Sequence, residues 1–234
     1  MVTGAPPKHP ALVERDEKAL TREIAGDAAA ARNDSREALS CWGEGLDIFV
    51  ERAMAAPAAR VASKIATLEE SLGENEAACA HYEQAIEFYR KARDTQHVPM
   101  CLNNLGMLRK QAGDLEEAAV LLARAMSEAA RHEGDLQTEM ALIATNLGAV
   151  LCECGDLLGA EKRHMEALGI LEQLYGTTHP EIGLSLGHLA VIYHMRGEEK
   201  KAKSFYTAAL AILDEFPGLH EAEREILQQN LSEL

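Results

Sequence analysis

Apolar and small residues recur along the chain in blocks of similar length. The stretch LNNLGMLRKQAGDLEEAAVLLARAM, which begins at Leu102, has relatives that begin at Ala144 and Leu186. In each block a small residue follows a large apolar one, a Gly is then followed by an acid, and Ala recurs five and twelve positions after that Gly. This pattern predicts that each block forms one helix, a tight turn at the Gly and a second helix.

The Gly-acid pairs set the length of the repeat. Their glycines lie 40, 42 and 42 residues apart, at Gly73, Gly113, Gly155 and Gly197. Gly ends a helix at low cost in free energy. The negative charge of the acid after it interacts favourably with the free N–H groups at the start of the next helix. Small residues mark positions where two antiparallel helices approach closely. These columns are Ala66, Gly106, Gly148 and Ala190, then Ala78, Ala118, Ala160 and Ala202, then Ala85, Ala125, Ala167 and Ala209.

An altered fifth copy precedes these four. Gly26, Ala38 and Gly45 lie forty residues before members of the small-residue columns, and Asn33 replaces the turn Gly. Asn tolerates the left-handed conformation, and Asp34 or Ser35 can cap the next helix. Trp42 then aligns with Tyr82, Leu122, His164 and Tyr206. We expect Trp42 to fill a contact between helices rather than to stack on a ligand.

Composition and charge narrow the function classes. Hydrophobic residues make up 47% of the 234 residues and aromatic residues 4%, a mixture that favours helices over strands. The net charge of −15 disfavours nucleic acid as a partner. The sequence shows no apolar run long enough for a membrane span and no signal pattern, so we expect no membrane partner and a cytoplasmic protein. Cys152 and Cys154 are expected to be small buried hydrophobes rather than metal ligands.

No motif for catalysis stands out. His188 and His194 lie six apart, whereas metal ligands on one helix face are three or four apart. No phosphate-binding loop, G-x-S-x-G or H-E-x-x-H motif is found. The sequence therefore predicts no enzyme, no catalytic residue, no metal site, no cofactor and no small-molecule substrate. An enzyme with an unrecognised catalytic part is the less favoured alternative, because the repeats fill the chain.

The columns resemble the tetratricopeptide repeat, which has a small residue at position eight, Ala at twenty and twenty-seven, and an aromatic residue at twenty-four. One copy meets this pattern at Ala190, Ala202, Tyr206 and Ala209. Another meets it at Gly106, Ala118 and Ala125, with the large apolar Leu122 at the aromatic position. The resemblance implies an all-α fold, a right-handed α-solenoid of five helix pairs with a C-terminal capping helix. We expect a flexible N-terminus at 1–12, repeats at 13–56, 57–96, 97–136, 137–178 and 179–216, and the cap at 217–234. Ile226, Leu227 and Leu231 form the apolar stripe expected of that cap.

The resemblance also implies a site for a protein or an extended peptide. In tetratricopeptide repeats the first helices line a concave groove, whose candidate binding residues here are Lys64, Asn103, Asn104, Lys110, Asn146 and His188. Asn can donate to and accept from a peptide backbone. The two lysines would add positive charge. We expect Asn104 and Asn146 to be largely exposed.

A narrower resemblance is to kinesin light chain repeats. It is carried by the seam LEQLYGTTHPEIGLSLGHLAVIY from Leu171 and by NNLG and TNLG cores ending at Gly106 and Gly148. This link between two repeats is clear only once in the sequence. The N-terminal heptad segment that kinesin light chains have is not found. The resemblance implies a free-standing, light-chain-like scaffold or adaptor of the bacterial kind, whose partner is a bacterial tubulin filament. The alternative is a regulatory repeat protein that senses a peptide.

Overall fold

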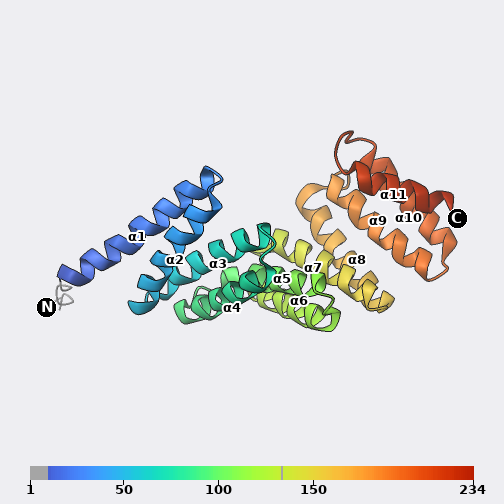
Figure 1. The fold of residues 1–234 in the computed structure, drawn as a ribbon. Coiled ribbons are helices and arrows are strands. Elements are labelled where there is room, and N and C mark those ends of the chain that lie inside the picture. Colours follow the sequence, from blue (N-terminus) through green and yellow to red (C-terminus); the bar gives the residue numbers. More distant parts are fainter. Residues whose placement is uncertain (1–9, 133) are drawn as a thin grey trace. The chain divides into compact units, whose positions relative to one another are not determined.

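The computed structural model describes residues 10–132 and 134–234, which form helices and connecting turns without strands. Figure 1 shows the helices in chain order. The α-helices of these residues are α1 (Pro10–Ala31), α2 (Ser35–Glu51), α3 (Ala55–Ser71), α4 (Asn75–Ala92), α5 (Val98–Gln111), α6 (Leu115–Ala129), α7 (Gln137–Glu153), α8 (Leu157–Tyr175), α9 (Pro180–Met195), α10 (Glu199–Leu213) and α11 (Glu221–Ser232). Short 3-10 helices follow α4 and α6, at Thr95–His97 and Ala130–His132. The predicted all-α repeat fold, with helix pairs and one closing helix, is confirmed.

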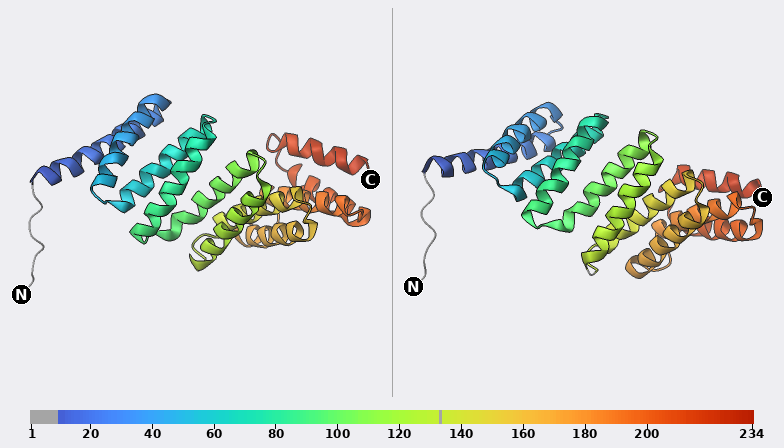
Figure 2. Two further views of the ribbon diagram at one scale, coloured as in Figure 1. Left: turned by 60° about the horizontal axis from the view of Figure 1, so that its bottom comes forward. Right: turned by 90° about the horizontal axis from the view of Figure 1, so that it is seen from below.

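Contacts between the chain's helices divide it into two units, Met1–Cys101 and Leu102–Leu234. In the first unit α1 packs on α2 and α3 packs on α4, and in the second α7 packs on α8 and α9 on α10. Both views of Figure 2 show the partners of these pairs running side by side. Helix α1 begins at Pro10, so residues 10–12 of the expected flexible N-terminus are helical, and 1–9 lie outside the described residues.

The turns between paired helices follow the Gly-acid pattern. Gly73, Gly113, Gly155 and Gly197 have φ between 72° and 88°, and Asn33, the substitute for Gly, has φ of 60°. The acid after each turn stands at the N-cap of the next helix, but only some of these side chains cap it. Asp156 accepts from Gly159 N at 2.9 Å, and Asp34 accepts from Glu37 N at 3.0 Å.

The other N-cap acids make no side-chain cap hydrogen bond. They are Glu74, Asp114 and Glu198. These three side chains therefore stabilise the helix start only through the attraction between their charge and the helix dipole. Asp34 and Asp156 add a cap hydrogen bond to that attraction and stabilise it more.

Each helix pair is held at its centre by one small and one large residue. The large residues Trp42, Tyr82, Leu122, His164 and Tyr206 are 5%, 1%, 0%, 2% and 0% exposed. A Cβ added at Gly26 would lie 2.3 Å from the Trp42 ring, and one at Gly148 would lie 2.6 Å from His164 Nε2. Trp42 thus fills an inter-helix contact, as predicted, and its Nε1–H donates to Asp27 Oδ1 at 2.9 Å.

The contact between Gly148 and His164 predicts a measurable packing penalty. We expect Gly148→Ala to lower the free energy of unfolding by about 1–2 kcal/mol, because overpacking outweighs the gain in helix propensity. Gly169→Ala is the matched control in the same helix pair, since a Cβ there meets nothing within 4 Å. It should raise stability by about 0.5–1 kcal/mol. Urea unfolding of the two variants measures both effects, and equal changes would contradict the packing argument.

Helix α11 covers the end of the last pair by packing on α10 and α9. Leu227 is 6% exposed and would lie 2.9 Å from a Cβ at Gly187. Leu231 also packs against this core, but Ile226 is 57% exposed. The predicted apolar stripe of the cap is therefore wrong for Ile226, because α11 turns Leu227 and Leu231 toward the core instead.

Candidate functional site

An ion-pair network occupies the first-helix face of the first unit. Arg60 of α3 donates from Nε and Nη2 to the two carboxylate oxygens of Glu23 on α1, at 2.7 and 2.8 Å. Lys64 Nζ reaches the same carboxylate at 2.9 Å and both oxygens of Asp27 at 2.8 Å. Glu23 is only 5% exposed, and the Arg60 guanidinium holds the pKa of its carboxyl below the ordinary 4.5. The charge of Lys64 is therefore already compensated within the protein.

An amide network occupies the same face of the second unit. Asn146 of α7 donates from Nδ2 to Asn103 Oδ1 of α5 at 2.9 Å, and Asn103 donates to Asn104 Oδ1 at 3.2 Å. Asn103 is 3% exposed, while Asn104 and Asn146 are half-buried. The expectation that Asn104 and Asn146 are largely exposed is wrong, because these amides contact one another within and between repeats.

The Asn103 contact carries a stability prediction. Replacing Asn146 with Ala leaves the buried Asn103 oxygen without its donor, so we expect the free energy of unfolding to fall by about 1–2 kcal/mol. Helix propensity alone would give the opposite sign. A denaturant melt in which Asn146→Ala is neutral or stabilising would show that the buried amide bond is unimportant.

A second line of contacts runs near the ends of the first helices. Lys110 Nζ of α5 pairs with Glu153 of α7 at 2.8 Å. The Cys152 thiol of α7 donates to the thioether of Met195 on α9, with 3.6 Å between the sulfurs. Lys110, like Lys64, is therefore paired rather than available as an uncompensated charge.

These contacts share one register. Glu23 and Lys64 are 41 residues apart, and Asn103 with Asn146, like Cys152 with Met195, are 43 apart. Each separation is one residue more than the repeat length. We call these contacts inter-repeat rungs: Glu23–Lys64, Asn103–Asn146, Lys110–Glu153 and Cys152–Met195. Sequence reasoning missed them, although pairs of complementary residues at that separation are a signal that could reveal them.

His188 on α9 departs from this register. The residue that would pair with it, Thr145, instead donates its hydroxyl to the Ala141 carbonyl at 3.0 Å. His188 is exposed, and one face of its ring packs on His164 of α8, with 4.8 Å between ring centroids. Of the six candidate residues, His188 is the one that is exposed, whereas the other five are buried or half-buried.

His164 is a buried imidazole without a full set of partners. It is 2% exposed, and its Nδ1 has no hydrogen-bond partner. Burial, with a smaller contribution from His188, lowers the pKa of His164 to about 3. The ring is therefore neutral at physiological pH and serves as a packing residue, because a proton would place an unpaired charge in the core.

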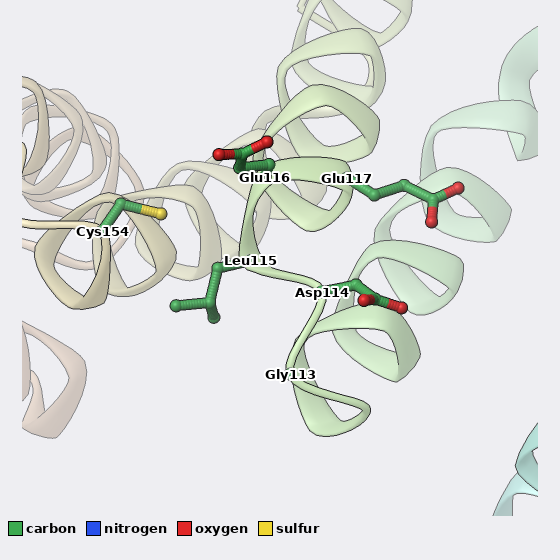
Figure 3. Close-up of a pocket in the computed structure, with 6 residues that line it drawn as sticks. All are labelled: Gly113, Asp114, Leu115, Glu116, Glu117 and Cys154. Atoms are coloured by element: carbon green, nitrogen blue, oxygen red, sulfur yellow. The ribbon is translucent and has the colours of Figure 1, made fainter.

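One hollow at a repeat turn has the wrong arrangement for catalysis. It encloses about 640 Å³ at the turn before α6 and is lined by Gly113, Asp114, Leu115, Glu116, Glu117 and Cys154. Figure 3 shows Glu116 on one side of the helix start and Asp114 and Glu117 on the other, so the carboxylates do not converge. In 10–132 and 134–234 no group of three or more His, Cys, Asp or Glu could hold a metal ion.

The two cysteines of the C-x-C pair differ from expectation. Cys154 is exposed and Cys152 is half-buried, so the prediction of two small buried hydrophobes is wrong. Both lie at the end of α7, next to the Gly155 turn, where the neighbouring helices no longer cover the chain.

Two smaller hollows lie along α9. One, of about 410 Å³, is bordered by Leu142 and Thr145 of α7, Tyr175 of α8, and His179 and Glu181 at the start of α9. Its Tyr175 and His179 rings stack with 4.4 Å between centroids. The other, of about 170 Å³, lies between α9 and α11. Both hollows expose mainly apolar surface, and each has one carboxylate in its lining, Glu181 in the first and Glu223 in the second.

Helix pairs of this length, joined at Gly turns and closed by small-large contacts, define a helical repeat protein. The chain matches the tetratricopeptide repeat family over residues 57–127 and 139–215, and it belongs to that family. Proteins of this family are typically non-enzymatic scaffolds. No helix in the described part of the chain is both long and apolar enough to cross a bilayer.

Among characterised proteins, the chain is similar to Protein KINESIN LIGHT CHAIN-RELATED 3 of Arabidopsis thaliana, with 25% identity over 218 residues, 88% of this chain and 32% of that protein. It is 30% identical over 102 residues to the Clustered mitochondria protein of the same plant, which covers 42% of this chain and 7% of that protein. The chain thus spans a third or less of the length of either relative.

Solved structures share the fold. BtubC (BKLC) from P. vanneervenii matches with a TM-score of 0.74 and 23% identity, covering 89% of this chain and 84% of that one. YrrB, described as a TPR protein with an unusual peptide-binding site, matches with a TM-score of 0.64 and 16% identity, covering 94% and 96%. The resemblance to kinesin light chain repeats is therefore confirmed at the level of family and fold.

Proposed function

We propose that the protein is a light-chain-like scaffold or adaptor, and that its partner is a protein filament of the bacterial tubulin type. The observation that carries the scaffold role is the exposed apolar surface of the second unit. Leu142 of α7 is 44% exposed, and Met195 of α9 and Ile226 of α11 are each 57% exposed, and α9 contacts both α7 and α11. Exposed apolar patches on a folded repeat array are typical of protein contact surfaces.

The filament is supported by likeness alone. The chain is related to a kinesin light chain-related protein and has the fold of BtubC. Of the candidate residues, His188 is proposed to contact the partner. The others are proposed to shape the surface, through rungs for Lys64, Asn103, Lys110 and Asn146 and through the contact with Asn103 for Asn104. The proposal implies a cytoplasmic protein without catalytic activity.

Co-sedimentation with polymerised bacterial tubulin tests this function. The protein is expected to pellet with the polymer in a saturable manner and to stay in the supernatant without it. Unpolymerised tubulin subunits and an unrelated filament, actin, serve as controls. Failure to pellet over a wide range of polymer concentrations would overturn the filament as partner.

A second candidate function is a sensor of a short free peptide. The 410 Å³ hollow favours it, because Leu142, Tyr175 and His179 surround a space large enough for one or two side chains. A sensor should change its hydrogen-exchange protection around α7 and α8 when it binds such a peptide, with no polymer present. Saturable pelleting without any effect of peptides favours the scaffold instead.

A further inference from the structure

One face of α9 forms a continuous stripe. Glu181, Leu184, His188 and Val191 are spaced by three, four and three residues, and therefore lie on the same side of the helix. Leu184, His188 and Val191 line the 170 Å³ hollow, together with Glu223 and Ile226 of α11. We call this surface the α9–α11 groove.

The apolar part of the groove is open to solvent. Ile226 is 57% exposed although its neighbour Leu227 is 6% exposed and packs on the core. Leu184 and Val191 are half-buried beside it. A large apolar side chain from a partner would cover all three, which removes apolar surface from water and stabilises binding.

The polar part of the groove carries negative charge. No Lys or Arg pairs with Glu181 or Glu223 in the part of the chain that the structure describes, and the nearest basic contact is His220 Nδ1, 3.9 Å from Glu223. Burial against α8 lowers the pKa of His188, and the carboxylates of Glu181 and Glu223 act in the opposite direction. Both carboxylates thus lie close enough to act on this imidazole, which is mainly neutral at physiological pH.

We propose that the α9–α11 groove binds an extended segment of the partner protein that carries a large apolar residue next to a Lys or Arg. The apolar side chain enters the hollow between Leu184, Val191 and Ile226, and the cation lies toward Glu181 and Glu223. From Glu181 to Val191 the helix rises about 15 Å, at 1.5 Å per residue. An extended segment covers that length with about five residues. This inference rests on the proposed scaffold function and names the chemistry of the segment it holds.

The test uses the full chain and a phage-displayed library of random nonapeptides as the probe. Selected sequences are expected to combine Leu, Ile, Phe or Met with Lys or Arg within five positions. A synthetic peptide of the selected consensus is then titrated by fluorescence anisotropy. Its affinity is expected to fall about tenfold or more in Ile226→Asp, as for loss of a central anchor. Charge reversal by Glu181→Lys with Glu223→Lys should also weaken it, with a loss that shrinks as salt rises.

Val120→Asp on α6 is the matched control, because Val120 is 59% exposed and lies outside the groove. It should leave peptide affinity unchanged, and circular dichroism should show that every variant stays helical. An acidic consensus, an absence of enriched peptides, or equal binding by Ile226→Asp and wild type would each overturn the groove. The experiments distinguish the two proposals. If the protein pellets with tubulin polymer but selects no peptide, only the proposal for the α9–α11 groove is overturned.

Discussion

His164→Leu is expected to stabilise the protein, by an amount that grows as the pH falls. At pH 7 the change removes a buried Nδ1 that has no partner, and this should add about 1–3 kcal/mol. The chain itself shows that Leu fits, because Leu122 holds the same position against Gly106 that His164 holds against Gly148.

The pH dependence follows from the sign of the pKa shift. The pKa of His164 is about 3 in the folded protein and 6.5 ordinarily, so the unfolded chain binds the proton more readily. The stability of the wild type is fully present above pH 6.5 and falls as the pH drops below that value. At pH 5 the loss from this group is about 2 kcal/mol, from about 1.4 kcal/mol per pH unit. The difference between His164→Leu and wild type should therefore reach about 3–5 kcal/mol at pH 5.

Urea unfolding at pH 5, 6, 7 and 8 measures this effect. The reciprocal variant Leu122→His is the control, since it should introduce the same acid sensitivity into the neighbouring repeat. Parallel stability-pH curves for His164→Leu and wild type would show that His164 does not titrate as an isolated buried group.

Glu23→Ala is expected to lower the free energy of unfolding by about 2–4 kcal/mol, because Arg60 and Lys64 then face each other without the carboxylate between them. The estimate stays below that for a fully buried pair, since the side chains of Arg60 and Lys64 are 49% and 29% exposed and can recover water. Arg32→Ala breaks a pair with Glu37 whose side chains are 60% and 49% exposed, and should cost about 0–1 kcal/mol.

The Glu23 effect should also depend on pH with a known sign. The pKa of Glu23 is lowered in the folded protein, so its contribution is present above pH 4.5 and is lost as the pH falls through the folded-state pKa. Thermal melts should show a larger difference between wild type and Glu23→Ala at pH 7 than at pH 3. An equal difference at both pH values would assign the effect to packing rather than to the ion pairs.

The helix pairs could be predicted because their determinants are local. A Gly after a helix, an acid behind it, and one small residue opposite one large residue specify a pair whatever the neighbouring repeats contain. This reasoning placed Trp42 in a core contact and Asn33 in a left-handed turn, as the structure has them.

The state of the candidate binding residues could not be predicted in the same way. Whether the Asn146 amide is available depends on Asn103, which is 43 residues away. Whether the Lys64 ammonium is available to a partner depends on Glu23 in the preceding repeat. Position in the repeat identifies the face on which a side chain lies, but the residue at the matching position of the next repeat decides whether it is available. The groove between α9 and α11 was missed for a related reason: the orientation of α11, and hence the exposure of Ile226, depends on Gly187 accepting Leu227.

The inter-repeat rungs have a consequence for rearranging this chain. The four rungs join different side chains: carboxylate with ammonium at Glu23–Lys64, ammonium with carboxylate in the reverse order at Lys110–Glu153, amide with amide at Asn103–Asn146, and thiol with thioether at Cys152–Met195. A duplicated or transplanted repeat would bring its own half of a rung to a neighbour that lacks the other half. The repeats share a backbone pattern but cannot be exchanged without loss of these contacts. The side chains that meet between neighbouring repeats therefore specify the order of the repeats along the chain.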